Sequence, residues 1–139
     1  ELPAPIPAAP LAIFGENEIA LISVQTEGTP GPDGRVAVAA VWQALRPLDR
    51  DYTVFFHVVG ADGQRYGQQD GLPLDGETPT SGWTPGRMVT DRHEATLAPD
   101  APIGGPYQYW LGLYDGATGV RLAVGADDKF IFAPESDAP

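Results

Sequence analysis

The chain of 139 residues contains no cysteine, and its only two histidines are His57 and His93. The absence of cysteine excludes disulfides, thiol chemistry and cysteine-ligated zinc. Two histidines are too few for a histidine-rich metal site. A single domain of this length buries roughly two thirds of the surface of its unfolded chain, so its core needs neither a disulfide nor a metal.

Positive charge is also scarce, because the chain has 8 Lys and Arg residues against 19 Asp and Glu residues, for a formal net charge of −11. Such a surface repels phosphate, so we expect no nucleic-acid partner and no binding to anionic membrane surfaces. The acidic residues are scattered along the chain, which is typical of a solvated surface. We expect no cofactor. Calcium, which prefers oxygen ligands, is the alternative, although the chain has no Asp-x-Asp-x-Asp-Gly loop.

Long hydrophobic runs are absent from the sequence. No apolar stretch approaches the ~18–20 residues of a membrane span, and no signal-peptide pattern is visible. We therefore expect a membrane to be reached only through a segment that this sequence does not contain. The pattern of an amphipathic helix of ~10 residues is missing as well.

Short runs rich in β-branched and aromatic residues are present instead, separated by clusters of Gly, Pro and Asp. This pattern predicts an all-β fold, an antiparallel β-sandwich of about seven or eight strands, either immunoglobulin-like or jelly-roll. Residues 35–45 contain four alanines and could also form a helix, but their alternation of Val and Ala favours a strand. The expected strands cover residues 18–26, 35–45, 52–59, 64–69, 88–97, 107–115, 120–124 and 129–133.

The proline pattern suggests where the domain begins. Residues 1–17 open with prolines at near-alternating positions, which favour an extended chain, so we expect a proline-rich spacer or a strap lying on the domain. Residues 18–133 form the single sandwich domain in this interpretation, and residues 134–139 form a polar tail.

The central part of the chain, residues 52–97, holds the features that suggest a binding site. Residues 52–59 are apolar on both faces, which indicates a central strand. A long loop follows at residues 70–86, and loops of this length tend to be functional or disordered. Three prolines and Trp83 favour an ordered loop. In the next strand, Asp91 and His93 would share the inward face, which is unusual for a buried surface.

Three stretches of the chain together resemble a known family. They are residues 53–71 (TVFFHVV, then DGQ and QDG), residues 79–92 (PTSGW, then PG, V and DR) and residues 105–122 (GPY, then LGLYD and TGVRL). The ordered set is similar to the C-terminal β-sandwich that follows the membrane spans of some bacterial, often Chloroflexi-type, family 39-like (mannosyltransferase-like) membrane glycosyltransferases. The similarity covers about residues 18–124. It implies an extracytoplasmic module, at the cell surface or secreted, and carries over no catalytic residue.

Two functions of different classes follow from these observations. The first is a non-catalytic accessory or interaction module, with a protein or glycan partner outside the cell. The second is a carbohydrate-binding module that uses the region of residues 70–91, because sugars pack on aromatic rings and bond to carboxylates. Its candidate ligand-binding residues are Trp83, Asp70, Asp91, Tyr66 and Tyr114.

Enzymatic activity is not expected of this domain. A triad of Ser81, His93 and Asp91 lacks the Gly-x-Ser-x-Gly elbow that would support it. A glycoside hydrolase would need two carboxylates across a sugar-sized cleft. The aspartates that precede glycine in this chain are explained by turns. An exposed Trp83 would favour carbohydrate binding, whereas a buried Trp83 with its indole N–H on a backbone carbonyl would close the end of the sandwich.

Overall fold

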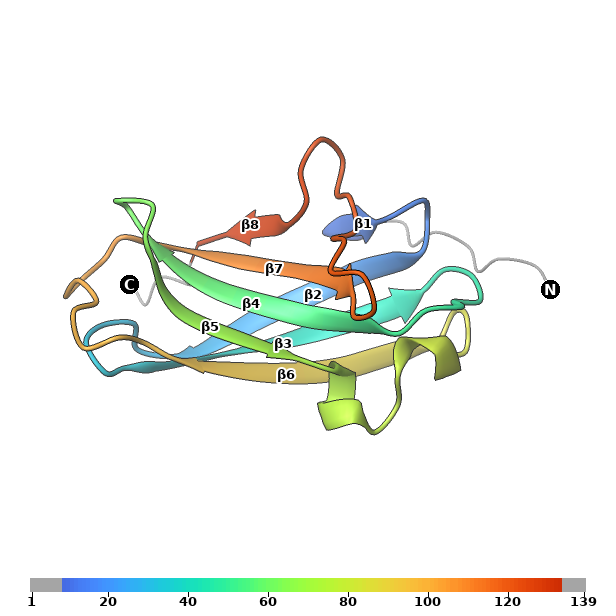
Figure 1. Cartoon of the computed structure of the whole chain (residues 1–139), viewed down its shortest axis with the longest axis horizontal. Coiled ribbons are helices and arrows are strands. Elements are labelled where there is room, and N and C mark those ends of the chain that lie inside the picture. The colour runs from blue at the N-terminus through green and yellow to red at the C-terminus, as the bar shows by residue number, and fades with distance from the viewer. Residues whose placement is uncertain (1–8, 134–139) are drawn as a thin grey trace.

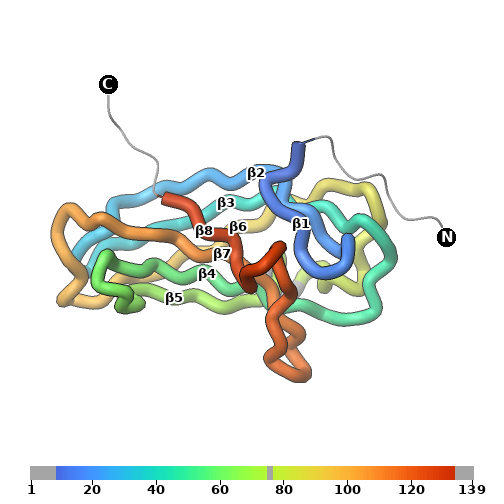
Figure 2. Tube along the Cα trace, turned by 90° about the horizontal axis from the view of Figure 1, so that it is seen from above, coloured from blue at the N-terminus to red at the C-terminus, as the bar shows by residue number. Residues whose placement is uncertain are grey.

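The computed structural model describes residues 9–133, apart from the side chains at positions 75 and 76. In this range the chain forms two four-stranded sheets with antiparallel pairing, which confirms the predicted all-β antiparallel sandwich (Figure 1). Figure 2 shows the sheets as two layers. No helix within residues 9–133 is long and apolar enough to span a membrane.

The first sheet has the strand order β1-β2-β3-β6 and the second has the order β5-β4-β7-β8. The strands are β1 (Ala12–Phe14), β2 (Ile19–Gly28), β3 (Arg35–Ala44), β4 (Tyr52–Gly60), β5 (Arg65–Gly71), β6 (Met88–Thr96), β7 (Tyr107–Asp115) and β8 (Phe130–Phe132). Two short 3-10 helices, η1 (Pro73–Gly76) and η2 (Thr80–Gly82), lie between β5 and β6.

The strand order resolves the choice between the two predicted topologies in favour of the immunoglobulin-like one. Strands β2, β3 and β6 take the positions of strands A, B and E, and β5, β4, β7 and β8 take those of C′, C, F and G. Strand β1 adds an outer strand to the first sheet. The hydroxyl of Tyr107, at the start of β7, donates to the carbonyl oxygen of Pro102. This contact is the tyrosine corner of immunoglobulin-like domains.

Two of the expected boundaries need correction. Residues 12–14 form strand β1, so the sandwich begins inside the segment 1–17 that we expected to be a spacer or strap. Residues 120–124 form no strand and make only isolated bridges, Tyr114 with Arg121 and Val124 with Asp127. The turn-rich sequence around them leaves too short a run for a ladder. The expected polar tail and residues 1–8 of the spacer lie outside the described residues.

The hydrophobic core lies between the inner faces of the two sheets. Trp42 on β3 packs edge-on against Phe14 with ring centroids 5.5 Å apart, and Phe56 on β4 meets Tyr109 on β7 at the same distance. All four side chains are almost fully buried. Burial of one such side chain stabilises the fold by roughly 1.5–3 kcal/mol.

A polar cluster, here called the clasp, joins the edge strands β5 and β6 of the two sheets. Asp91 and His93 face inward from β6, as predicted, and are only 2% and 5% exposed. His93 Nε2 lies 2.6 Å from Asp91 Oδ2, and His93 Nδ1 lies 2.6 Å from Gln69 Oε1 on β5. The backbone N–H of Leu74 in η1 donates to Asp91 Oδ1 at 2.8 Å. The clasp therefore holds β6, β5 and the start of the loop together through two almost fully buried side chains, Asp91 and His93.

Replacement of Asp91 tests the structural role of the clasp. Asp91→Ala leaves the imidazole of His93 and the N–H of Leu74 without their acceptor, so we expect the free energy of unfolding to fall by about 3 kcal/mol. Urea denaturation measures this change. Glu94→Ala, on the exposed side of the same strand, is the control and should change stability by less than about 0.5 kcal/mol. Equal stabilities for the two variants would contradict the assignment.

Candidate functional site

The outer face of the second sheet carries an aromatic strip. Strand pairing places Phe55 of β4 between Asp70 of β5 and Gly112 of β7. One row along, His57 is paired with Gln68 on one side and Trp110 on the other. Paired residues of neighbouring strands share one face of a sheet, so these side chains lie together on the outside of the sandwich. The strand β4 is thus apolar on both sides, as the sequence predicted.

Glycine at position 112 makes room for the ring of Phe55. A Cβ atom at this position would come within 2.3 Å of the ring. The ring can therefore lie flat on the sheet, where it is fully buried although it is outside the core between the sheets. Tyr114 stacks beside it, with ring centroids 6.3 Å apart.

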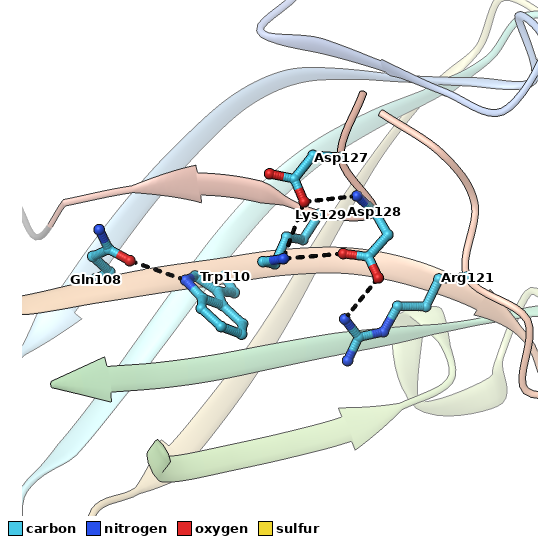
Figure 3. A network of polar contacts seen from close by, with 6 residues as sticks. All are labelled: Gln108, Trp110, Arg121, Asp127, Asp128 and Lys129. Carbon is cyan, nitrogen blue, oxygen red and sulfur yellow. Dashed lines mark hydrogen bonds and ion pairs between the residues drawn. The ribbon is translucent and has the colours of Figure 1, made fainter. Parts of the chain in front are cut away.

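Two cations from the segment between β7 and β8 cover this strip. The guanidinium carbon of Arg121 lies 4.2 Å from the ring centroid of Phe55, and Lys129 Nζ lies 4.5 Å from that of Trp110. In Figure 3, Lys129 lies beside Trp110, and Asp128 lies between Lys129 and Arg121. Contacts of this kind contribute about 0.5–2 kcal/mol each. These contacts cover the apolar outer face, so that no third layer of structure is needed there.

Two adjacent carboxylates hold the cations in place (Figure 3). Lys129 Nζ donates to Asp127 and to Asp128 at 3.0 Å each, and Arg121 donates to the other oxygen of Asp128 at 3.3 Å. The hydrogen bond from Lys129 lowers the pKa of Asp128, and the hydrogen bond to Asp127 raises the pKa of Lys129. The cover is therefore a charge-balanced network.

Next to this cover lies a hollow of about 280 Å³, here called the outer-face pocket. Tyr114 donates its hydroxyl hydrogen to Asp70 Oδ2 at 2.9 Å, and Gln68 Nε2 donates to Asp70 Oδ1 at 2.9 Å. The pocket thus combines an aromatic floor with a carboxylate, an amide and two guanidinium groups. Its lining residues are Phe55, His57, Arg65, Gln68, Asp70, Tyr114, Gly119 and Arg121.

His57 in the floor of the pocket is uncharged at neutral pH. Burial and, to a smaller extent, the positive charge of Arg65 together lower the pKa of His57 to about 4, although Asp70 opposes the shift. Its Nε2 atom lies 4.0 Å from Asp70 Oδ1, too far for a hydrogen bond. The His57 side chain packs against Phe55 on the outer face and makes no hydrogen bond within the described residues.

The structure brings together only two of the residues predicted from the sequence to bind a ligand. Asp70 and Tyr114 meet in the outer-face pocket. Asp91 is instead part of the clasp on the inner face. Tyr66 donates its hydroxyl hydrogen to Asp62 at the far end of β5 and does not line the pocket. The loop 70–91 therefore does not form one site from these side chains.

Trp83 closes the loop instead of presenting a free ring. It is only 4% exposed, and its indole N–H donates to the carbonyl oxygen of Thr78 at 2.9 Å. Thr80 fixes the same loop, since its hydroxyl accepts the N–H of Tyr52 at 3.0 Å and donates to the carbonyl of Arg50 at 2.6 Å. Trp83 does border a hollow of about 230 Å³, but it is not the exposed platform that carbohydrate binding at this loop would need.

The remaining residues of the pocket were not predicted from the sequence. The signal for Phe55 was the run of apolar residues on both faces of one strand, which implied only a central position. Nothing in the local pattern indicated that Arg121, far along the chain, would fold back over this strand. Arg65 and Gln68 had the appearance of ordinary exposed strand residues.

The polar groups do not assemble a metal centre or a catalytic triad in the described part of the chain. No three His, Asp or Glu side chains among these residues gather around a common point that could hold a metal ion. Both ring nitrogens of His93 contact Asp91 and Gln69, so neither is free for Ser81. The backbone N–H of Ser81 instead donates to Asp51.

Comparison with known proteins supports the fold but gives no family. No family model and no curated protein matches the chain. A glycosyl hydrolase family 2 member from Bacteroides cellulosilyticus matches with a TM-score of 0.53 and 10% identity. A second such member, from Bacteroides cellulosilyticus DSM 14838, matches with a TM-score of 0.53 and 12% identity. Each match covers 82% of this chain but only 14% and 15% of the hydrolase chains, so the similarity concerns a β-sandwich fold alone.

The shifted pKa of His57 predicts how stability depends on pH. In the folded protein the imidazole of His57 binds a proton only near pH 4, whereas in the unfolded chain it does so near pH 6.5. The contribution of neutral His57 is therefore complete above pH 7 and decreases as the pH falls through this window, by about 3 kcal/mol in total. Urea denaturation from pH 8 to pH 4 should show this loss in the wild type and a smaller loss in His57→Phe. Parallel curves for the two proteins would contradict the prediction.

Proposed function

We propose that the chain is a non-catalytic accessory module that binds carbohydrate in the outer-face pocket. The observation that carries the proposal is the convergence of Asp70, Gln68, Arg65 and Tyr114 around a floor of packed aromatic side chains. Sugars have apolar ring faces that pack on aromatic rings, and hydroxyl groups that donate and accept hydrogen bonds. The pocket offers partners for both.

Each polar group has a role that its chemistry supports. Asp70 accepts hydrogen bonds from sugar hydroxyls, with Tyr114 and Gln68 holding its carboxylate in a fixed orientation. Arg65 is exposed and makes no ion pair within residues 9–133, so its N–H groups are free to donate. The edge of the Tyr114 ring provides an apolar contact. A site fixed in this way loses little entropy on binding.

The pocket does not have the arrangement that glycoside hydrolysis requires. Of the residues that line it, Asp70 alone carries a carboxylate. Hydrolysis generally uses two carboxyl groups, one on each side of the scissile bond. This supports a module that binds a glycan and leaves the chemistry to another domain or protein.

The context of the fold agrees with this role. Two solved proteins of similar fold are glycosyl hydrolase family 2 members, and the chain matches a small part of each. The sequence resembles an appendage of membrane glycosyltransferases. Both observations support a sandwich that accompanies a carbohydrate-active protein, and the second supports a place outside the cytoplasm, where its partner is a glycan.

Two arginine variants test the proposal. An array of soluble oligosaccharides identifies the ligand, and isothermal titration calorimetry measures its affinity. Arg65→Ala removes a hydrogen-bond donor from the pocket, so we expect a loss of affinity of about tenfold. Arg87→Ala is the matched control, because Arg87 is also exposed and borders the hollow beside Trp83. We expect the control to bind as the wild type does.

The outcome distinguishes the pocket from the loop. An array on which the wild type binds no glycan would refute the proposal. A loss caused by Arg87→Ala and not by Arg65→Ala would move the site to the hollow beside Trp83.

A further inference from the structure

A second hollow lies where β4 begins and β5 and β7 end, next to the outer face of the second sheet. It has a volume of about 510 Å³, and its lining residues are Asp49, Arg50, Asp51, Thr53, Leu72, Asp115, Gly116 and Ala117. None of these residues was among the sequence-predicted site residues, and none lines the outer-face pocket.

Strand geometry places the two hollows end to end. Along β4, the pocket is lined by His57 and Phe55, and the second hollow begins with Thr53 and continues to Asp51. Along β5, Asp70 lines the first and Leu72, directly after the strand, lines the second. The sequence of outward-facing residues therefore passes from one hollow directly into the other. From His57 to Thr53 the strand advances by four residues, or about 13 Å. This distance exceeds the width of one sugar ring, so the two hollows could hold different sugar units of one chain.

A single aromatic residue marks the junction between them. Tyr114 lines the pocket and is paired with Thr53, which lines the second hollow. Its ring is held by stacking on Phe55 and by its hydrogen bond to Asp70. A fixed, half-buried ring between two polar hollows is a suitable surface for the apolar face of a sugar in the middle of a longer chain.

The second hollow offers hydrogen-bonding groups that the fold does not fully use. Arg50 donates through one nitrogen to Asp115 at 2.8 Å, which leaves its other N–H groups toward solvent. One carboxylate oxygen of Asp51 accepts a hydrogen bond from the backbone N–H of Ser81, which leaves the other oxygen available to a ligand. Asp49 is exposed and makes no hydrogen bond or ion pair in the range 9–133 that the structure describes.

We propose that the second hollow is a further subsite, so that the ligand is an oligosaccharide lying along β4 across Tyr114, with hydroxyl groups bound by Asp49, Arg50 and Asp51. This inference rests on the proposed function and specifies its ligand class. Affinity then increases with the length of the glycan until both hollows are occupied. A monosaccharide occupies the outer-face pocket alone.

The test uses mono- to hexasaccharides of mannose, glucose and galactose as probes, with affinities measured by isothermal titration calorimetry. The double variant D49N/D51N removes two of the negative charges that line the second hollow, with little change in shape. We expect it to lower the affinity for the longest bound probe by about tenfold and to leave the shortest bound probe unaffected. Asp70→Asn should weaken all lengths. D33N/D100N, which changes two exposed aspartates in the loops at the opposite end of β3, is the matched control and should bind as the wild type does.

The results separate this inference from the proposed function. Binding that Asp70→Asn weakens, but that neither grows with length nor responds to D49N/D51N, keeps the outer-face pocket and refutes the second subsite. Equal effects of D49N/D51N and D33N/D100N on the longest probe would refute it as a nonspecific effect of charge. Absence of binding to every probe would overturn both proposals.

Discussion

The double-sided apolar character of β4 is the constraint on which the rest of the structure depends. Its inner face, with Phe56, supplies the core between the sheets, and its outer face, with Phe55 and His57, would otherwise be exposed to water. Covering a face of this kind usually requires another layer of structure. Here the sequence provides a glycine at position 112 for the ring to lie against and two cations, Arg121 and Lys129, to lie over the aromatic strip. The cover is only partial, and the uncovered part is the outer-face pocket.

Charge distribution reinforces this arrangement. Three of the chain's 8 basic residues, Arg65, Arg121 and Lys129, lie close enough to His57 to lower its pKa, although the chain as a whole is strongly acidic. Asp127 and Asp128 balance the two cations that cover the strip. The pocket is therefore polar without a large net charge, which suits a ligand of neutral sugars better than an anion. His57, which is buried and neutral, and the clasp residues also contribute to the stability of the fold. A change in this region therefore also changes the free energy of unfolding.

Local sequence patterns predicted most of the fold, because each strand carries its own alternation of side chains and each turn its own Gly, Pro or Asp. The inward position of Asp91 and His93 followed from period two alone. Patterns failed where structure depends on distant contacts. Residues 12–14 are too few to show a period, and they become a strand because β2 provides an edge for them. Residues 120–124 form no strand, because Arg121 lies over the outer face while Leu122 and Val124 pack against the core.

The candidate site was predictable only in part for the same reason. Asp70 and Tyr114 were both predicted as candidate ligand-binding residues, but their meeting depends on the order β5-β4-β7, which no single strand reveals. Trp83 drew attention as a large ring in a polar loop, and such a ring serves a plug as well as a platform. Only its burial and the hydrogen bond to Thr78 distinguish the two roles.

The three tryptophans of the chain offer the most direct test of the central claim. Trp42 lies in the core, Trp83 in the loop and Trp110 on the outer face, with its ring centroid 6.1 Å from that of His57. The indole N–H signals in a nitrogen-15 NMR spectrum report on each place separately during titration with a bound oligosaccharide. Our account predicts that the signal of Trp110 shifts while those of Trp42 and Trp83 stay in place. A shift of Trp83 with Trp110 unchanged would contradict it.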